Sequence, residues 1–274
     1  MTHNDNLIKE NIHMKTLSLT LDMVYKGNLI LVNRDYPYRE YTKTNLAPIQ
    51  VSDGPILMQR KSATIYTSLM NKISAWNHIT AVSGWRSKIE QEQIYTGSIA
   101  ENGEDFTTKY VALPGHSEHQ TGLAVDVALA QGEIDFIRPH FPYTGICGDF
   151  RQAAGRHGFI ERYPKGKEKI TGIAHEPWHF RYVGTPHANL IEVMGITLEE
   201  YHQKLKEHPH GDKPLIHEMG SMTYEISYLP AHKDEALLII PNGMSHTVSG
   251  NNSDGFIVTL WRDINWNANL NMAG

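Results

Sequence analysis

The sequence predicts a fold built from both helices and strands, followed by a C-terminal segment made of strands. Three observations point to this. Apolar residues recur every three to four positions, with one gap, over residues 56–76, a spacing typical of one face of an amphipathic helix. The short β-branched run ITAVSGW at residues 79–85 is typical of a strand. From residue 222 onward, four further strand-like runs are separated by turn residues such as Asn242-Gly243.

The N-terminal third is predicted to alternate between helices, strands and irregular segments. Residues 1–14 are polar and are expected to form a frayed terminus. The apolar run NLILVN at residues 28–33 predicts a strand, whereas three prolines favour an irregular connection over residues 34–55. The expected order that follows is helix, strand and helix over residues 56–76, 79–85 and 86–98.

Two predicted strands in the middle of the chain each carry a polar residue where an apolar one would normally pack. Asp126 lies among alanines and valines in the predicted strand 122–129, and His179 lies between two aromatic residues in the predicted strand 178–183. Because side chains alternate between the two faces of a strand, Asp126 and His179 are each predicted to lie on the face away from the large apolar side chains next to them. Taken alone, either residue could simply face solvent. Short helices are predicted over residues 148–157, 186–194 and 198–207.

The composition shifts after the last of these helices. Residues 208–211, with the sequence His-Pro-His-Gly, predict a linker, and the strand-like runs follow it. The sequence therefore predicts a main domain over residues 15–207 and a β-rich extension over residues 212–274.

Composition and charge restrict the possible functions. The chain has 274 residues, one cysteine and sixteen histidines, so a disulfide framework or a cysteine-rich zinc site is excluded. Any transition metal must be held mainly by histidine and carboxylate. A net charge of −5 and a pI of about 6.3 argue against nucleic acid or an anionic membrane surface as the main partner. No apolar run of signal-peptide or membrane-spanning length is present, which favours a cytoplasmic protein without a membrane anchor.

Histidine and carboxylate residues are placed so that they can form a metal centre. His119 lies seven residues before Asp126 in a glycine-bracketed loop, and Glu176 lies three residues before His179. Hydrolytic zinc sites need three protein ligands, a water position and an unliganded base beside it. His119, Asp126 and His179 can supply the ligands and Glu176 the base. A histidine-rich chain can also produce such a set by chance.

Three segments resemble signatures of the zinc D,D-carboxypeptidases and D,D-dipeptidases. SEHQTGLAVD at residues 117–126 is similar to their Ser-x-His-x-x-Gly-x-Ala-x-Asp element, and EPWHFRYVG at residues 176–184 to Glu-x-Trp-His-x-Arg-Tyr-Val-Gly. SGWRSKIEQ at residues 83–91 resembles Ser-Gly-Tyr-Arg-Ser-x-x-x-Gln, with Trp85 replacing the usual tyrosine. The resemblance covers roughly residues 28–195, and within the family it points to the VanY and VanXY enzymes of vancomycin resistance. The missing membrane anchor favours the VanXY type.

The resemblance implies an α+β fold, in which helices pack on a central, mainly antiparallel sheet. It implies a hydrolase that removes C-terminal D-Ala from the D-Ala-D-Ala dipeptide and from the muramyl pentapeptide precursor, both cytoplasmic substrates. One zinc ion per active site is expected as the cofactor.

The same resemblance assigns roles to individual residues. His119, Asp126 and His179 match the zinc ligands, and Glu176 matches the general base. Arg86 matches an arginine that faces the substrate carbonyl oxygen. The residues that match or neighbour the site for the terminal carboxylate are Ser117, Gln91 and Tyr110.

More ordinary roles exist for several of these residues. Arg86 could instead cap or pair with its helix, Ser117 could be a turn residue and Gln91 an exposed helix residue. The loop over residues 130–143 is expected to cover the pocket and to affect selectivity between dipeptide and pentapeptide.

Two other functions remain open from the sequence. The first is an endolysin-like peptidoglycan endopeptidase that cleaves L-alanyl-D-glutamate bonds, with residues 212–274 as a wall-binding domain. The second is a non-catalytic zinc-bearing binding module. The presence of both Glu176 and Arg86 argues against the second, since a binding module needs the ligands but no base.

Overall fold

The computed structural model describes residues 13–39, 45–49 and 54–264, and these residues form twelve strands, seven α-helices and three 3-10 helices. The strands are β1 (Met14–Thr20), β2 (Leu46–Ile49), β3 (Ile56–Gln59), β4 (Ile79–Ser83), β5 (Ala124–Leu129), β6 (Phe159–Tyr163), β7 (Glu176–Tyr182), β8 (Leu215–Met219), β9 (Met222–Pro230), β10 (Glu235–Pro241), β11 (Ser245–Gly250) and β12 (Gly255–Asp263). The helices are η1 (Leu21–Tyr25), α1 (Arg60–Lys72), α2 (Lys88–Asn102), α3 (Glu104–Tyr110), η2 (Glu118–Thr121), α4 (Gly145–Ala154), η3 (Gly155–His157), α5 (Glu168–Thr171), α6 (His187–Met194) and α7 (Leu198–Lys206). Nowhere in the described ranges is there a helix with the length and apolar character that crossing a membrane requires.

The central sheet has the strand order β4-β5-β7-β6, and all its neighbours are antiparallel. The large apolar side chains of β5 and β7 point to one face, where they join a core with α1 and α4. Members of this core include Val125, Val127, Trp178 and Phe180. Alternation along the strands therefore leaves Asp126 and His179 on the opposite face. The implied α+β fold with an antiparallel central sheet is confirmed.

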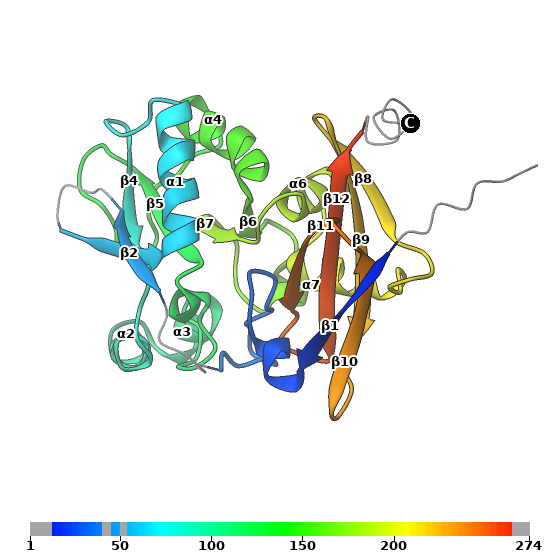
Figure 1. The fold of residues 1–274 in the computed structure, drawn as a ribbon. Helices are drawn as coiled ribbons and strands as arrows, with labels where there is room; N and C mark the ends of the chain where they lie inside the picture. The colour runs from blue at the N-terminus through cyan, green and yellow to red at the C-terminus, as the bar shows by residue number, and fades with distance from the viewer. Residues whose placement is uncertain (1–12, 40–44, 50–53, 265–274) are drawn as a thin grey trace, which may run out of the picture.

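A second sheet, in the order β11-β12-β9-β8, lies across the molecule from the first (Figure 1). Helices α6 and α7 lie between the two sheets, and one apolar cluster joins them by including Leu190 of α6, Leu205 of α7, Ile160 of β6 and Ile226 of β9. The N-terminal strand β1 pairs with β10 along its whole length. Part of the predicted main domain thus packs with the C-terminal strands.

The predicted strand over residues 28–33 is wrong. The segment is buried but irregular, because most of its backbone groups pair with side chains and turn residues rather than with a neighbouring strand. The Arg181 guanidinium donates to the carbonyls of Asn28 and Ile30, each at 2.9 Å. The Asn252 amide donates to a third carbonyl of the segment at 2.7 Å. Its apolar composition reflects burial, not a place in a sheet.

Other boundaries also differ from the prediction. The segment 34–55 contains β2, which pairs with β3, so it is not wholly irregular. The helix predicted from residue 56 begins at Arg60, since β3 comes first and the Gln59 side chain caps α1. The predicted linker 208–211 hydrogen-bonds to the backbone of β9. Strands β1, β6 and β8 had no predicted counterpart. Residues 1–12 of the predicted frayed terminus lie outside the described part.

We expect Gly122→Ala to destabilise the protein by about 2–5 kcal/mol. Gly122 ends η2 with φ +71°, and an added Cβ would lie 2.8 Å from the backbone nitrogen of Gln59. The left-handed conformation costs a residue with a side chain about 1–2 kcal/mol, and overpacking adds about 1–3 kcal/mol. Gly132→Ala is the control, since Gly132 has φ +70° but open space around it. Denaturant unfolding should show the larger loss for Gly122→Ala, and equal losses would contradict this account.

Candidate active site

The loop before β5 presents one nitrogen of His119 to the polar face of the central sheet. His119 lies in η2 and is buried, and its Nδ1 is 2.6 Å from the carbonyl oxygen of Gly84. A carbonyl oxygen only accepts hydrogen bonds, so Nδ1 carries the proton. Nε2 then keeps its lone pair, and it lies 3.1 Å from Oδ2 of Asp126.

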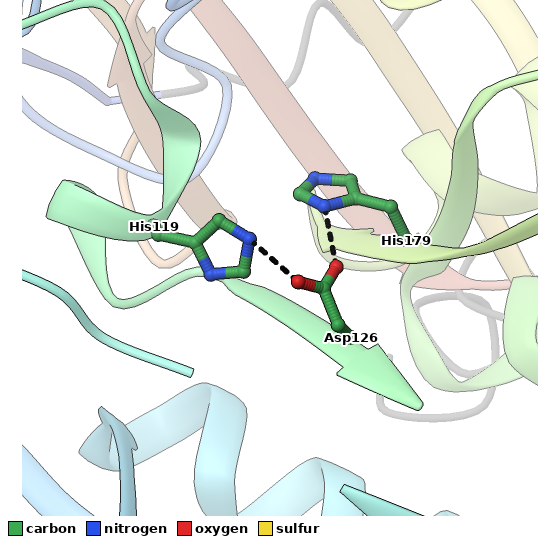
Figure 2. A group of neighbouring side chains, drawn as sticks. All are labelled: His119, Asp126 and His179. Atoms are coloured by element: carbon green, nitrogen blue, oxygen red, sulfur yellow. Dashed lines mark hydrogen bonds and ion pairs between the residues drawn. The ribbon is translucent and has the colours of Figure 1, made fainter. Parts of the chain in front are cut away.

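The pairing of β5 with β7 brings Asp126 opposite His179, although 53 residues separate them in the chain. Nδ1 of His179 is 2.8 Å from Oδ1 of Asp126 (Figure 2). His119, Asp126 and His179 each offer one ligand atom, and these atoms lie within 4.8 Å of one another. Two imidazole nitrogens and a carboxylate oxygen in a buried cluster are a donor set that fits zinc. The structure therefore brings together the three predicted ligands.

A register shift in β7 places Glu176 on the same side as His179. In a regular strand, residues three apart point to opposite faces. Here Glu161 of β6 is opposite Phe180, whereas Tyr163 is opposite Glu176, so β7 holds more residues than β6 over this stretch. As a result, Oε2 of Glu176 lies 3.9 Å from Nδ1 of His179.

Arg86 lies beside the cluster and is held by Gln91. Its Nη2 is 3.6 Å from Oδ2 of Asp126, and its Nη1 donates to Oε1 of Gln91 at 3.1 Å. Gln91 is only 1% exposed and donates to the carbonyl of Ala112, so it is not an exposed helix residue. Helix α2 is capped by Ser87 in a capping box, which leaves Arg86 free of that task.

These side chains line a cavity of about 410 Å³. Ser117 and Tyr110, the remaining predicted site residues, also line it, and Ser117 is buried. The loop over residues 130–143 contributes Phe136 and Ile137 to the wall, and Phe136 is 74% exposed. The cavity thus combines polar groups around the ligand cluster with an apolar edge.

Burial and neighbouring charge shift the acid–base behaviour of the cluster. Burial lowers the pKa of His119 to about 4 and raises the pKa of Glu176 to about 8. Burial opposes charge on Asp126, but the two histidines outweigh it and hold its pKa well below the usual range. Burial also opposes charge on His179, but the negative charge of Asp126 outweighs it and raises that pKa to about 9. Asp126 thus stays negatively charged between the two histidines, and a negative group in that place favours a bound cation.

Sequence reasoning missed Glu118, which is fully buried behind His179. Its Oε2 lies 3.5 Å from Nε2 of His179, and its Oε1 accepts hydrogen bonds from Arg162 and Arg181. The available signal was an acidic residue directly beside His119. Tyr163 was also missed, and its ring lies 4.9 Å from that of His179, between centroids.

A cluster of two histidines and an aspartate, with a buried carboxylate and an arginine beside it, defines a metal-dependent hydrolase. The sequence model of the VanY family, described as D-alanyl-D-alanine carboxypeptidase, matches residues 56–185. The chain belongs to this family, as the resemblance indicated.

Two curated relatives support the assignment. The chain is 41% identical over 183 residues to the bifunctional D-Ala-D-Ala dipeptidase and carboxypeptidase VanXYC of Enterococcus gallinarum, a match that covers 66% of this chain and 96% of the relative. It is 32% identical over 265 residues to a D-alanyl-D-alanine carboxypeptidase of Enterococcus faecium, covering 92% of this chain and 80% of the relative.

Solved structures agree with the sequence comparisons. The vancomycin-resistance D,D-dipeptidase VanXYg, in complex with a D-Ala-D-Ala phosphinate analog, matches with a TM-score of 0.88 and 51% identity, over 91% of this chain and 100% of that one. A match over 91% of this chain must include part of residues 212–274. The VanXYg structure therefore shares at least part of the C-terminal region. VanYB in complex with D-Alanine-D-Alanine matches with a TM-score of 0.54 and 31% identity, over 65% of this chain and 98% of that one.

Proposed function

We propose that the protein is a zinc-dependent D,D-peptidase that hydrolyses the bond between two D-alanine residues. The substrates are the D-Ala-D-Ala dipeptide and the muramyl pentapeptide precursor that ends in it, and their removal contributes to glycopeptide resistance. The observation that carries the proposal is the convergence of the three ligand atoms with Glu176 in one cavity. Relatives named for D-Ala-D-Ala dipeptidase and carboxypeptidase activity support the substrate class.

Nε2 of His119, the carboxylate of Asp126 and Nδ1 of His179 would hold one zinc ion. Support comes from their spacing and from a VanY relative solved in complex with Zn(II). When bound, zinc would supply Lewis-acid polarisation of the scissile carbonyl and a more acidic water.

Glu176 is the group placed to move the proton. It takes a proton from the attacking water and delivers it to the leaving amine, since its carboxylate lies beside the ligand cluster without being one of the three ligands.

Arg86 stabilises the oxyanion that forms as water adds to the carbonyl. Its guanidinium is fixed by Gln91 on one side and faces Asp126 on the other, so it needs little reorganisation during the reaction. Gln91 acts mainly through Arg86, because both polar ends of its side chain are engaged in the protein. Ser117 and Tyr110 remain candidates for contacts with the terminal carboxylate, since both line the cavity.

All proposed site residues lie within the proposed peptidase domain, residues 15–207, and none lies in the proposed extension 212–274. No contact in the described part of the chain favours cleavage of L-alanyl-D-glutamate bonds over D-Ala-D-Ala. The cytoplasmic location stays a prediction.

We expect metal removal to abolish D-Ala release. A chelator-treated, dialysed sample should lose activity on both the dipeptide and the pentapeptide, because Glu176 and Arg86 alone cannot replace the Lewis acid. Added Zn²⁺ should restore release of free D-Ala, measured by a coupled D-amino acid assay. The control is the same sample incubated with Mg²⁺, a hard ion that prefers oxygen ligands. Full activity in protein shown to be metal-free would contradict the proposal, and clearing of purified cell walls without D-Ala release would favour the endopeptidase.

A further inference from the structure

Resting on the proposed zinc site, we propose that Glu118 is a positioning residue for the metal ligand His179. Its carboxylate fixes the imidazole with the proton on Nε2, so that the lone pair of Nδ1 is presented to the metal. Two buried arginines hold Glu118 in that place.

The first argument is the environment of the His179 ring. Nδ1 faces Asp126 and Glu176, on the side of the ligand cluster. Nε2 points away from the cluster, toward Oε2 of Glu118 at 3.5 Å. Nε2 of His179 and Oε2 of Glu118 are both buried, and neither forms a hydrogen bond with any of the described residues, so the two atoms face each other at 3.5 Å as a close ion-pair contact. Because leaving two buried polar atoms unpaired is costly, we infer that a proton on Nε2 is donated to the Glu118 carboxylate through a small closing shift once zinc takes the Nδ1 side.

The second argument is that the other oxygen of Glu118 is already engaged. Oε1 accepts hydrogen bonds from Nε of Arg162 at 2.8 Å and from Nη1 of Arg181 at 2.7 Å. The side chains of all three residues are completely buried. The two guanidinium groups therefore fix the carboxylate plane, and Oε2 is left for the histidine. Outer partners of this kind orient metal ligands and set their tautomer.

The arginines are themselves held from several sides. Arg162 pairs with both carboxylate oxygens of Glu199 on α7, at 2.6 and 3.0 Å. Arg181 donates to the carbonyls of Asn28 and Ile30 in the buried irregular segment. The network thus contains two arginines and two glutamates, of which only Glu118 approaches His179. Glu199 offers a matched control, since its loss removes one negative charge from the same network without touching the ligand.

The test compares E118Q with E199Q in the full-length protein. Zinc affinity is measured on metal-free samples by competition with a chromophoric chelator, and folding stability by denaturant unfolding. Loss of an outer partner typically lowers metal affinity about 10–100-fold, and we expect this for E118Q. For E199Q we expect zinc affinity close to that of wild type, because Glu199 pairs with Arg162 and does not contact the ligand. Both variants are expected to lose stability, because each leaves a buried arginine with less compensating charge.

A second readout reports directly on the ring. In zinc-loaded wild type, the Nε2 proton of His179 should be visible by ¹⁵N-edited NMR and protected from exchange with water. E118Q should weaken that protection and E199Q should retain it. If E118Q does not fold, E118D replaces it. The aspartate of E118D keeps a negative charge beside the arginines. Its side chain is shorter, however, so its carboxylate lies further from His179, and zinc affinity should still fall.

Equal losses of zinc affinity in E118Q and E199Q would overturn the proposal, because Glu118 would then act only through the stability of the network. Unchanged affinity in E118Q would also overturn it. Wild-type protein that binds no zinc would instead contradict the proposed function itself, so the two failures are distinguishable.

Discussion

Replacing Glu176 with glutamine is expected to lower kcat for D-Ala release by about 10²–10⁴-fold, the range typical of a lost general acid–base group. Glutamine keeps the size of the side chain but cannot accept a proton from water. Neither carboxylate that lies close to His179 besides Glu176 can take its place, because Asp126 is one of the three ligand candidates and Glu118 pairs with two arginines. Glu101 also lines the cavity, but it is exposed near the end of α2. Steady-state rates on the dipeptide and the pentapeptide are the measurement.

Zinc affinity separates loss of the base from loss of the site. E176Q should bind zinc about as tightly as wild type, since Glu176 is not among the three ligands. Glu168→Gln is the control, because Glu168 is an exposed glutamate on α5 and should have no effect. Zinc-loaded, folded E176Q that releases D-Ala at the wild-type rate would exclude Glu176 as the base.

Replacing Arg86 with alanine is expected to lower kcat by about 10²–10³-fold, the usual loss when one oxyanion donor is removed. The guanidinium lies beside Asp126 and is held by Gln91, so it is aimed before substrate arrives. Arg86→Lys should recover only part of the loss, because a lysine lacks the planar fork that Gln91 holds. Gln91→Ala should cost less than Arg86→Ala, since it disturbs the position of the charge without removing it.

The split between kcat and KM decides what Arg86 does. An oxyanion contact forms only in the transition state, so its loss lowers kcat with little change in KM. A rise in KM at unchanged kcat would show instead that Arg86 binds the ground-state substrate. Unfolding curves for Arg86→Ala should be measured alongside, because the variant removes the guanidinium that lies 3.6 Å from Asp126.

Local pattern was enough to predict much of the site. Alternation along β5 and β7 places Asp126 and His179 opposite the apolar core, and this follows from strand geometry alone. The short spacing from His119 to Asp126 lets one loop bring both to the same place. These features depend on residues that are close together in the chain, so they can be predicted from one sequence alone.

Other features depend on which distant segments meet. The pairing of Asp126 with His179, and the register shift that turns Glu176 toward them, are set by three strands that come together from separate parts of the chain. The irregular segment 28–33 is held by Arg181 and Asn252, which come from distant parts of the chain. Strand β1 pairs with β10, which lies more than 200 residues further along. No local periodicity encodes such contacts.

The sequence by itself determined which kinds of metal ligand are available, because it has one cysteine and sixteen histidines. It also determined the strand faces on which Asp126 and His179 lie. Only the tertiary structure decided which nitrogen of each histidine faces the cluster. The carbonyl oxygen of Gly84 lies against Nδ1 of His119, and the carboxylate of Glu118 faces Nε2 of His179. The physical reason is that a ring's tautomer is set by the partner on its far side, and that partner comes from packing rather than from neighbours in the chain.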